Sequence, residues 1–128
     1  MRGRKPDQIA TDPGALRVVP SPPSWLAKDA KAEWRRIMPE LVRRRILTDG
    51  DMGAVEAYCT AVARIREAEK MIAAEGLTTG ARKHPAVAIQ NDAMTTARQL
   101  AAELGLTPVS RSRPTMRESA EDELEFLG

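Results

Sequence analysis

The sequence predicts an all-α protein built on a helical-hairpin core of about three helices. Three long stretches repeat apolar residues at spacings of three and four, which places those residues on one face of a helix. Glycine and proline residues separate the stretches, and no segment has the alternating pattern of a half-buried strand. With 128 residues, 42% of them hydrophobic and 30% charged, the chain is expected to form one globular domain.

The core of this domain has few aromatic side chains. The sequence contains two tryptophans, one tyrosine and one phenylalanine, so small and aliphatic residues must fill the interior. Such residues suit close helix packing, but a domain of this size buries only ~60–65% of its surface. A thin core of this kind favours self-association.

Residues 1–23 are predicted to form a flexible, basic and proline-rich arm. Five prolines stand in this stretch, and each one fixes its own backbone and biases the preceding residue away from a helix. Few large apolar side chains are present to offset the entropy of ordering. We expect the segment near Pro20–Pro23 to be extended.

The first helix is expected over residues 26–45. Its apolar face is formed by Ala30, Trp34, Ile37 and Leu41. Pro39 removes one backbone donor and crowds the preceding turn, so we expect a kink or a break near residues 37–39. The three arginines at 43–45 follow the apolar face and are expected to point outward.

The second helix is expected to follow a short turn and to end near Glu75. Thr48, with Asp51 three residues later, has the pattern of a capping box. The predicted buried stripe is Met52, Val55, Cys59, Val62 and Ile65, extended by Met71 or Ile72. Gly76 should end this helix in a left-handed conformation, and Leu77 should fold back onto its last turn.

The third helix is expected to begin at Pro85, because a missing backbone donor costs nothing in the first turn. Its apolar face is formed by Ala86, Ile89, Ala93, Ala97, Leu100 and Leu104. The small residues on this face allow another helix to approach closely. Gly105 and Pro108 end the helix.

Charge is distributed unevenly along the chain. Residues 1–117 carry a formal charge of +7, whereas residues 118–128 carry −5. A basic body with an acidic tail suggests two different partners, one of them a polyanion. The alternative is ordinary surface charge that keeps the protein soluble.

Two groups of basic residues have the character of a nucleic-acid contact. A mobile basic start can bind phosphates by releasing counterions, and a second cluster lies beside the first inter-helix turn. The alternative for the second cluster is a solvated helix end whose cations complement the helix dipole. The candidate DNA-binding residues are Arg2, Arg4, Lys5, Arg35, Arg36, Arg43, Arg44 and Arg45.

The turn at residues 48–51 also suggests a helix–turn–helix motif. However, the helix that follows it is about 25 residues long, and its first turn is acidic. A recognition helix is shorter and must enter a groove lined by phosphates. We therefore do not expect this helix to read bases.

We expect no enzyme activity, no metal site and no cofactor. A single cysteine, Cys59, excludes an intrachain disulfide and is expected in the core. His84 is expected at the surface near a helix start, without a nucleophile or carboxylate partner. Asp49 and Asp51 are explained by helix capping rather than by metal binding. No apolar run is long enough to span a bilayer, and the basic start lacks the apolar stretch of a secretion signal.

A series of short sequence patterns occurs along residues 2–113. They are Arg2-Gly3-Arg4-Lys5-Pro6, Pro23-Ser24-Trp25-Leu26, Ala30-Lys31-Ala32-Glu33-Trp34, Ile37-Met38-Pro39-Glu40-Leu41, Ile46-Leu47-Thr48-Asp49-Gly50-Asp51, Ala57-Tyr58-Cys59, and Glu103-Leu104-Gly105-Leu106-Thr107-Pro108 with Ser110-Arg111. Together these patterns resemble the small subunit of tailed-phage terminases. The spacer at residues 7–22 departs from that family, because it lacks the Gly-Asn-Pro-Gly-Lys type of sequence often found there.

The resemblance implies a subunit that is not an enzyme, forms a homo-oligomeric ring and binds double-stranded viral DNA in the host cytoplasm. It would present the DNA to the large terminase subunit, an ATPase and nuclease, for packaging into the procapsid. Residues 1–23 would then be the arm, 24–106 the DNA-binding and oligomerisation core, and 107–128 a tail. The tail would dock the large subunit through Leu124, Phe126 and Leu127.

Two alternatives remain open at this point. One is a small, dimeric, helical DNA-binding transcriptional regulator that uses the turn near residue 48. The other is an adaptor that binds only proteins and whose basic residues are merely solvated. The number of copies in the assembly separates the ring from the dimer, and salt-dependent DNA binding separates both from the adaptor.

Overall fold

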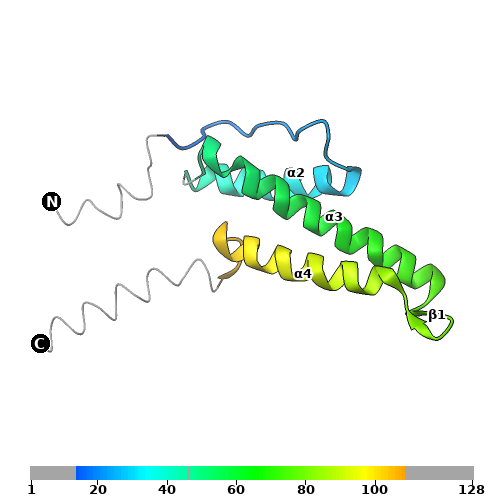
Figure 1. Ribbon diagram of the computed structural model, residues 1–128. Helices are drawn as coiled ribbons and strands as arrows, with labels where there is room; N and C mark the ends of the chain where they lie inside the picture. Colours follow the sequence, from blue (N-terminus) through cyan, green and yellow to red (C-terminus); the bar gives the residue numbers. More distant parts are fainter. Residues whose placement is uncertain (1–13, 46, 109–128) are drawn as a thin grey trace, which may run out of the picture.

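The computed structural model describes residues 14–45 and 47–108, which form three helices and a short hairpin (Figure 1). The elements are α2 (Lys28–Arg43), the single-turn helix η2 (Asp49–Asp51), α3 (Met52–Glu75), β1 (Thr78–Thr79), β2 (Arg82–Lys83) and α4 (Pro85–Glu103). The predicted mostly helical fold class is confirmed. The hairpin was not predicted, because strands of two residues are too short to show an alternating pattern.

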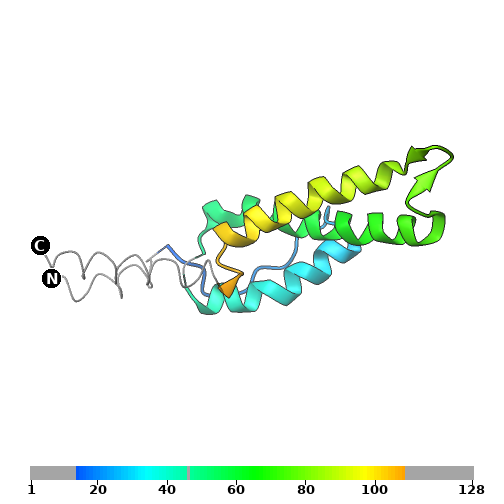
Figure 2. The ribbon, with the colours of Figure 1, turned by 90° about the horizontal axis from the view of Figure 1, so that it is seen from below.

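Helix α3 is the central element of the fold. It packs against α2 and against α4, and the hairpin β1–β2 joins α3 to α4 at the far end of the molecule (Figure 1). Figure 2 shows that α2 and α4 come close together where both helices end and diverge toward the hairpin. A helix that packs on two partners must bury more than one stripe of side chains.

The burial of α3 follows from this position. Val55, Cys59 and Ile72 of the predicted stripe are buried, and Met71 is 43% exposed. Met52, Val62 and Ile65 are partly buried against the core. The further buried residues of α3 are Tyr58, Ala61, Ala63 and Ala68. Most of these are alanines, which let the neighbouring helices approach closely.

Helix α2 buries the apolar face that the sequence predicted. Ala30, Trp34, Ile37 and Leu41 are all buried. The expectation at residues 37–39 was a kink or a break; the helix continues through Pro39 to Arg43, so the break does not occur. Met38 and Leu41 are fully buried on either side of the exposed proline, and this burial keeps both flanking turns helical.

The ends of the long helices follow the expected capping chemistry. The Thr48 backbone N–H donates to Asp51 Oδ2 at 2.8 Å, which completes the capping box before α3. After α4, Gly105 has a φ of 70°. The N–H groups of Gly105 and Leu106 donate to the carbonyls of Ala102 and Ala101 at 3.3 and 2.8 Å, the paired bonds of a Schellman motif.

The end of α3 differs from the prediction in two respects. Gly76 has a φ of 88° but a ψ of 167°, so it does not adopt the predicted left-handed helical conformation, although its N–H donates to the carbonyl of Ile72 at 2.7 Å. Leu77 does not fold back, because it is 65% exposed. Its carbonyl accepts the backbone N–H of His84 at 2.8 Å, which draws residue 77 into the base of the hairpin.

Residues 14–27 run beside α2 as an extended segment. The Leu16 N–H donates to the Leu47 carbonyl at 2.8 Å, and Trp34 Nε1 donates to the Pro20 carbonyl at 2.8 Å. Leu16 also packs against the core. We had expected a free arm as far as residue 23, but these contacts attach residues 14–23 to the helices. Residues 1–13 of the predicted arm lie outside the described residues.

A buried carboxylate links α2 to α3. Glu33 is 1% exposed and accepts hydrogen bonds from Arg36 Nε and Nη2 at 2.8 and 2.5 Å and from the Tyr58 hydroxyl at 3.0 Å. Arg66 Nη2 of α3 lies 3.5 Å from Glu33 Oε1. The hydrogen bonds from Arg36 lower the pKa of Glu33 despite the opposing effect of burial. We call these four residues the Glu33 cluster.

Replacing Glu33 by Gln should lower the free energy of unfolding by about 2 kcal/mol at neutral pH, because charge-assisted hydrogen bonds are lost in the interior. The native contribution is complete above the ordinary glutamate pKa of 4.5 and disappears as the pH falls through the lowered pKa of the folded state. Urea unfolding across this range should therefore show a weaker acid dependence in the variant.

Glu67→Gln is the matched control, because Glu67 is exposed on α3. Its unfolding free energy should stay within about 0.5 kcal/mol of the wild type. Equal stability and equal acid dependence in Glu33→Gln and the wild type would contradict a structural role for the buried carboxylate.

Candidate nucleic-acid interface

The side of α2 that faces away from the core is basic. Three exposed cations on this side are Lys28, Arg35 and Arg43. The first two are seven residues apart and the last two are eight residues apart, and each spacing is close to two helical turns. Arg36 lies beside them on the same side. Because a helix rises about 1.5 Å per residue, the row from Lys28 to Arg43 extends over about 22 Å. We call Lys28, Arg35, Arg36 and Arg43 the α2 basic face.

The acidic residues of α2 lie closer to the buried side and are already paired. Asp29 lies 3.7 Å from Lys70 Nζ of α3, and Glu33 belongs to the buried cluster. Arg43 Nη2 lies 2.7 Å from Glu40 Oε1, and the Arg43 hydrogen bonds are the main reason that the pKa of Glu40 is lowered. These carboxylates are therefore turned away from the outer surface or covered by cations.

The four cations of this face differ in how they are held. Arg36 and Arg43 each share a carboxylate, yet their side chains remain 65% and 73% exposed. Lys28 and Arg35 have no ion pair among the residues that the structure describes. These two side chains are the cations best placed to bind a new anion.

Arg44 and Arg45 do not extend the basic face. The Arg44 side chain is 17% exposed, and its Nη1 donates to the Gly105 carbonyl at 2.5 Å. It therefore ties the end of α2 to the end of α4, instead of pointing outward as expected. Arg45 is exposed, with a φ of 58°, so the chain leaves the helix direction there. The three arginines at 43–45 thus form no single cationic surface.

The remaining predicted site residues lie outside the described ranges. These are Arg2, Arg4 and Lys5 of the arm and Leu124, Phe126 and Leu127 of the tail. Sequence reasoning missed Lys28 as a member of the basic face. The signal available in the sequence was the spacing of seven residues between Lys28 and Arg35. Lys28 was missed because it is not part of a cluster of basic residues.

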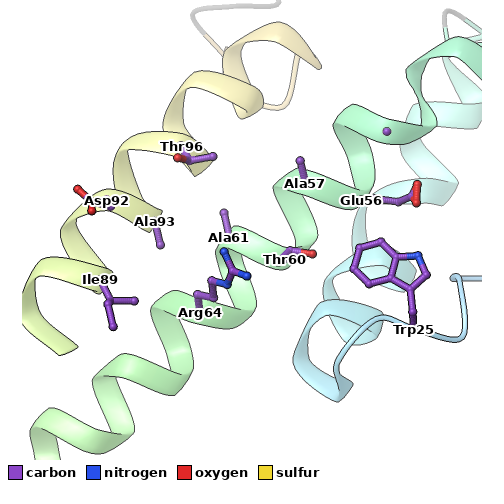
Figure 3. Close-up of a pocket in the computed structure, with 11 residues that line it drawn as sticks. Trp25, Glu56, Ala57, Thr60, Ala61, Arg64, Ile89, Asp92, Ala93 and Thr96 are labelled. Carbon is purple, nitrogen blue, oxygen red and sulfur yellow. The ribbon is translucent and has the colours of Figure 1, made fainter. Parts of the chain in front are cut away.

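A groove lies over α3, between α4 on one side and Trp25 on the other (Figure 3). It has a volume of about 640 Å³, and small residues such as Ala57, Thr60 and Ala61 line it along α3. Trp25 is 63% exposed and Ile89 is 52% exposed. Ile89 was predicted to lie in the core, but it faces this groove because α4 packs on α3 through its alanines.

The charged residues of the groove are few and of both signs. Glu56 and Arg64 of α3 and Asp92 of α4 line it together with the small and apolar residues. This lining differs in kind from the α2 basic face. We call it the α3–α4 groove.

Two groups considered for reactivity have structural roles. His84 is 4% exposed, which contradicts the expected surface position. Its Nδ1 accepts the Ala86 N–H at 3.0 Å as the predicted cap of α4, and its Nε2 lies 3.4 Å from Glu75 Oε2. Burial raises the pKa of the Cys59 thiol to about 12. Cys59 is therefore a neutral core residue at physiological pH.

The described residues contain no group of three or more histidine, cysteine or acidic side chains that could hold a metal ion. Within the same residues, no helix is both long and apolar enough to cross a membrane.

A family model described as "Phage terminase, small subunit" matches residues 30–121, from α2 to beyond the end of α4. Neither the curated proteins nor the solved structures gave a match. The family model covers well over half of the 128 residues, and it agrees with the resemblance seen in the sequence patterns. The chain belongs to the phage terminase small-subunit family.

Proposed function

We propose that this protein binds double-stranded viral DNA, assembles into a homo-oligomeric ring and presents the DNA to the large terminase subunit. The large subunit would supply the ATPase and nuclease activities, so this chain would need no catalytic residue and no cofactor. Packaging of the genome into a procapsid would place it in the host cytoplasm. The observation that carries the proposal is the α2 basic face.

The α2 basic face suits a contact with the phosphate backbone. Lys28, Arg35 and Arg43 are separated by about 10–12 Å along the helix, so they can reach different phosphates of a duplex rather than one anion. Lysine and arginine side chains on one helix face bind phosphates without reading bases. The basic arm at Arg2, Arg4 and Lys5 would add contacts of the same kind.

The α3–α4 groove suits packing against a second copy of the chain. Its floor consists of small side chains, which allow a helix to approach closely, and Trp25 and Ile89 expose apolar surface beside it. A ring requires two different surfaces of each protomer to meet. The groove would be one of these surfaces, and the DNA-binding α2 basic face would stay free.

DNA binding should depend on Lys28 and Arg35. Replacing both by Ala removes the two unpaired cations of the α2 basic face and should lower the slope of log affinity against log salt by about 1.8. Binding should weaken similarly for all sequences, because only phosphate contacts are lost. Fluorescence anisotropy over a salt series with a labelled duplex measures both quantities.

Arg98→Ala is the control, since it removes an exposed cation from α4 and should leave the slope unchanged. Arg44 stays unaltered, because its loss would disturb the contact between α2 and Gly105. Deletion of residues 1–6 should lower the slope by up to about 2–3. An unchanged slope in both the Lys28/Arg35 variant and the deletion variant would place the DNA on another surface.

Native mass spectrometry should show assemblies of more than two copies. Ala57→Trp fills the floor of the α3–α4 groove and should shift the population toward smaller species. Ala57 is exposed in the single chain, so the substitution should leave the helical circular dichroism intact.

Ala102→Trp is the matched control, because Ala102 is exposed on α4 and does not line the groove. It should leave the assembly unchanged. A wild-type protein that stays monomeric at high micromolar concentration would contradict self-association. A stable dimer would instead favour the transcriptional-regulator alternative.

The acidic tail is proposed to dock the large terminase subunit. Residues 118–127 combine five acids with Leu124, Phe126 and Leu127, as in peptides that order on a partner. Truncation after Arg117 should abolish binding to the large subunit in a pull-down while leaving assembly and DNA affinity intact. Normal binding by the truncated chain would rule out docking, and tighter DNA binding would indicate that the tail shields the basic arm instead.

A further inference from the structure

The hairpin between α3 and α4 is a second basic surface. Thr78 pairs with Lys83 and Thr79 pairs with Arg82 in an antiparallel register, and all four residues are exposed. The hairpin projects at the end of the α3–α4 pair, opposite to the last turn of α4 (Figures 1 and 2). We call residues 78–83 the tip hairpin.

The charge of the tip hairpin is not balanced locally. Arg82 and Lys83 have no ion pair among the described residues. No acidic residue occurs between Gly76 and Asn91, and Glu75 lies 3.4 Å from His84. The negative end of the α3 dipole and the positive end of the α4 dipole both lie at the base of the hairpin, so the helix dipoles largely cancel there and the charge of the hairpin comes from its side chains.

The register places a hydroxyl and a cation together on each face of the ribbon. Side chains of directly paired residues point to the same side of a two-stranded sheet. Thr79 and Arg82 therefore share one face, and Thr78 and Lys83 share the other. Hydroxyl groups and cations are the side-chain donors that most often bind phosphate oxygens, and a two-stranded ribbon is narrow enough to enter the major groove of DNA.

The base of the tip hairpin is held in place. The His84 N–H donates to the Leu77 carbonyl at 2.8 Å, and the His84 ring caps α4. Gly80 has a φ of 66° and forms the turn. A surface that is ordered before binding loses less conformational entropy when it meets its partner.

The tip hairpin and the start of the α2 basic face lie toward the same end of the molecule. The Lys70–Asp29 ion pair of 3.7 Å sets the start of α2 beside α3. Lys70 precedes Gly76 by about 9 Å along the helix axis. Lys28 and the hairpin therefore both lie toward the end of the molecule where α3 ends.

We propose that the tip hairpin is a second contact with the backbone of double-stranded DNA, made through Arg82 and Lys83. This inference rests on the proposed DNA binding but assigns it to residues outside the α2 basic face and the arm. The ligand chemistry is a row of phosphates, without base reading. The hairpin could instead bind the acidic residues 118–128, and the experiment below distinguishes this contact from a contact with DNA.

The test compares Arg82→Ala/Lys83→Ala with the charge-conserving Arg82→Lys/Lys83→Arg in the full chain. The probe is a mixed-sequence DNA duplex over a salt series. The alanine variant should lower the salt slope by about 1.8, and the conserving variant should keep it. Circular dichroism and native mass spectrometry should give the same helix content and assembly for both variants as for the wild type.

An unchanged slope in the alanine variant, with normal binding by the wild type, overturns the hairpin contact alone. A wild-type chain that binds no duplex even at low salt overturns the proposed DNA binding as well. In a third outcome, the alanine variant binds DNA more tightly than the wild type, and truncation after Arg117 removes this difference in affinity. The hairpin then binds the acidic tail, and the inference is overturned.

A cross-linking experiment gives a second readout that does not depend on affinity. Ala81→Cys places a thiol at the exposed turn, where it can carry a photoactivated cross-linker. The buried Cys59 thiol, with its pKa raised to about 12, should not compete for the label. Cross-links to duplex DNA are expected from position 81 and not from Gln99→Cys on α4. The absence of cross-links from position 81, while DNA is bound, contradicts the contact.

Discussion

The buried carboxylate of Glu33 fixes how α2 sits on α3. A charge in the interior is costly unless it is paired and hydrogen-bonded, and Glu33 finds its partners on both helices: Arg36 on α2, and Tyr58 and Arg66 on α3. Rotating α2 about its axis would break these bonds. The same orientation buries Trp34 and turns Lys28 and Arg35 outward. The basic surface is therefore a consequence of the interior arrangement as much as of the surface sequence.

The fold separates surfaces of different chemistry. The α2 basic face points away from the core, whereas the α3–α4 groove is lined mainly by small and apolar residues. The tip hairpin lies at one end of the long helices, and Arg44 joins α2 to α4 at the other. Under the proposed function, separate surfaces would let the subunit bind DNA, neighbouring copies and a large subunit at the same time.

Local signals in the sequence were enough to place the helices. Proline at the start of α4, glycine after α3 and α4, and the Thr48–Asp51 capping box all act within a few residues. Features that depend on distant partners could not be predicted. The buried position of Glu33 depends on Tyr58 and Arg66, and the inward turn of Arg44 depends on the Gly105 carbonyl. The burial of His84 and the attachment of residues 14–23 likewise require contacts between separate elements. Ile89 was assigned to the core because its helical spacing matched, although spacing alone cannot tell a core face from an exposed groove.

The central claim is that DNA and self-association use different surfaces of this fold. A cryo-electron-microscopy map of the assembled protein with a DNA duplex tests it most directly. The account predicts duplex density against the α2 basic face and density of a neighbouring copy in the α3–α4 groove. Duplex density in the α3–α4 groove, with the α2 basic face buried between copies, would contradict it.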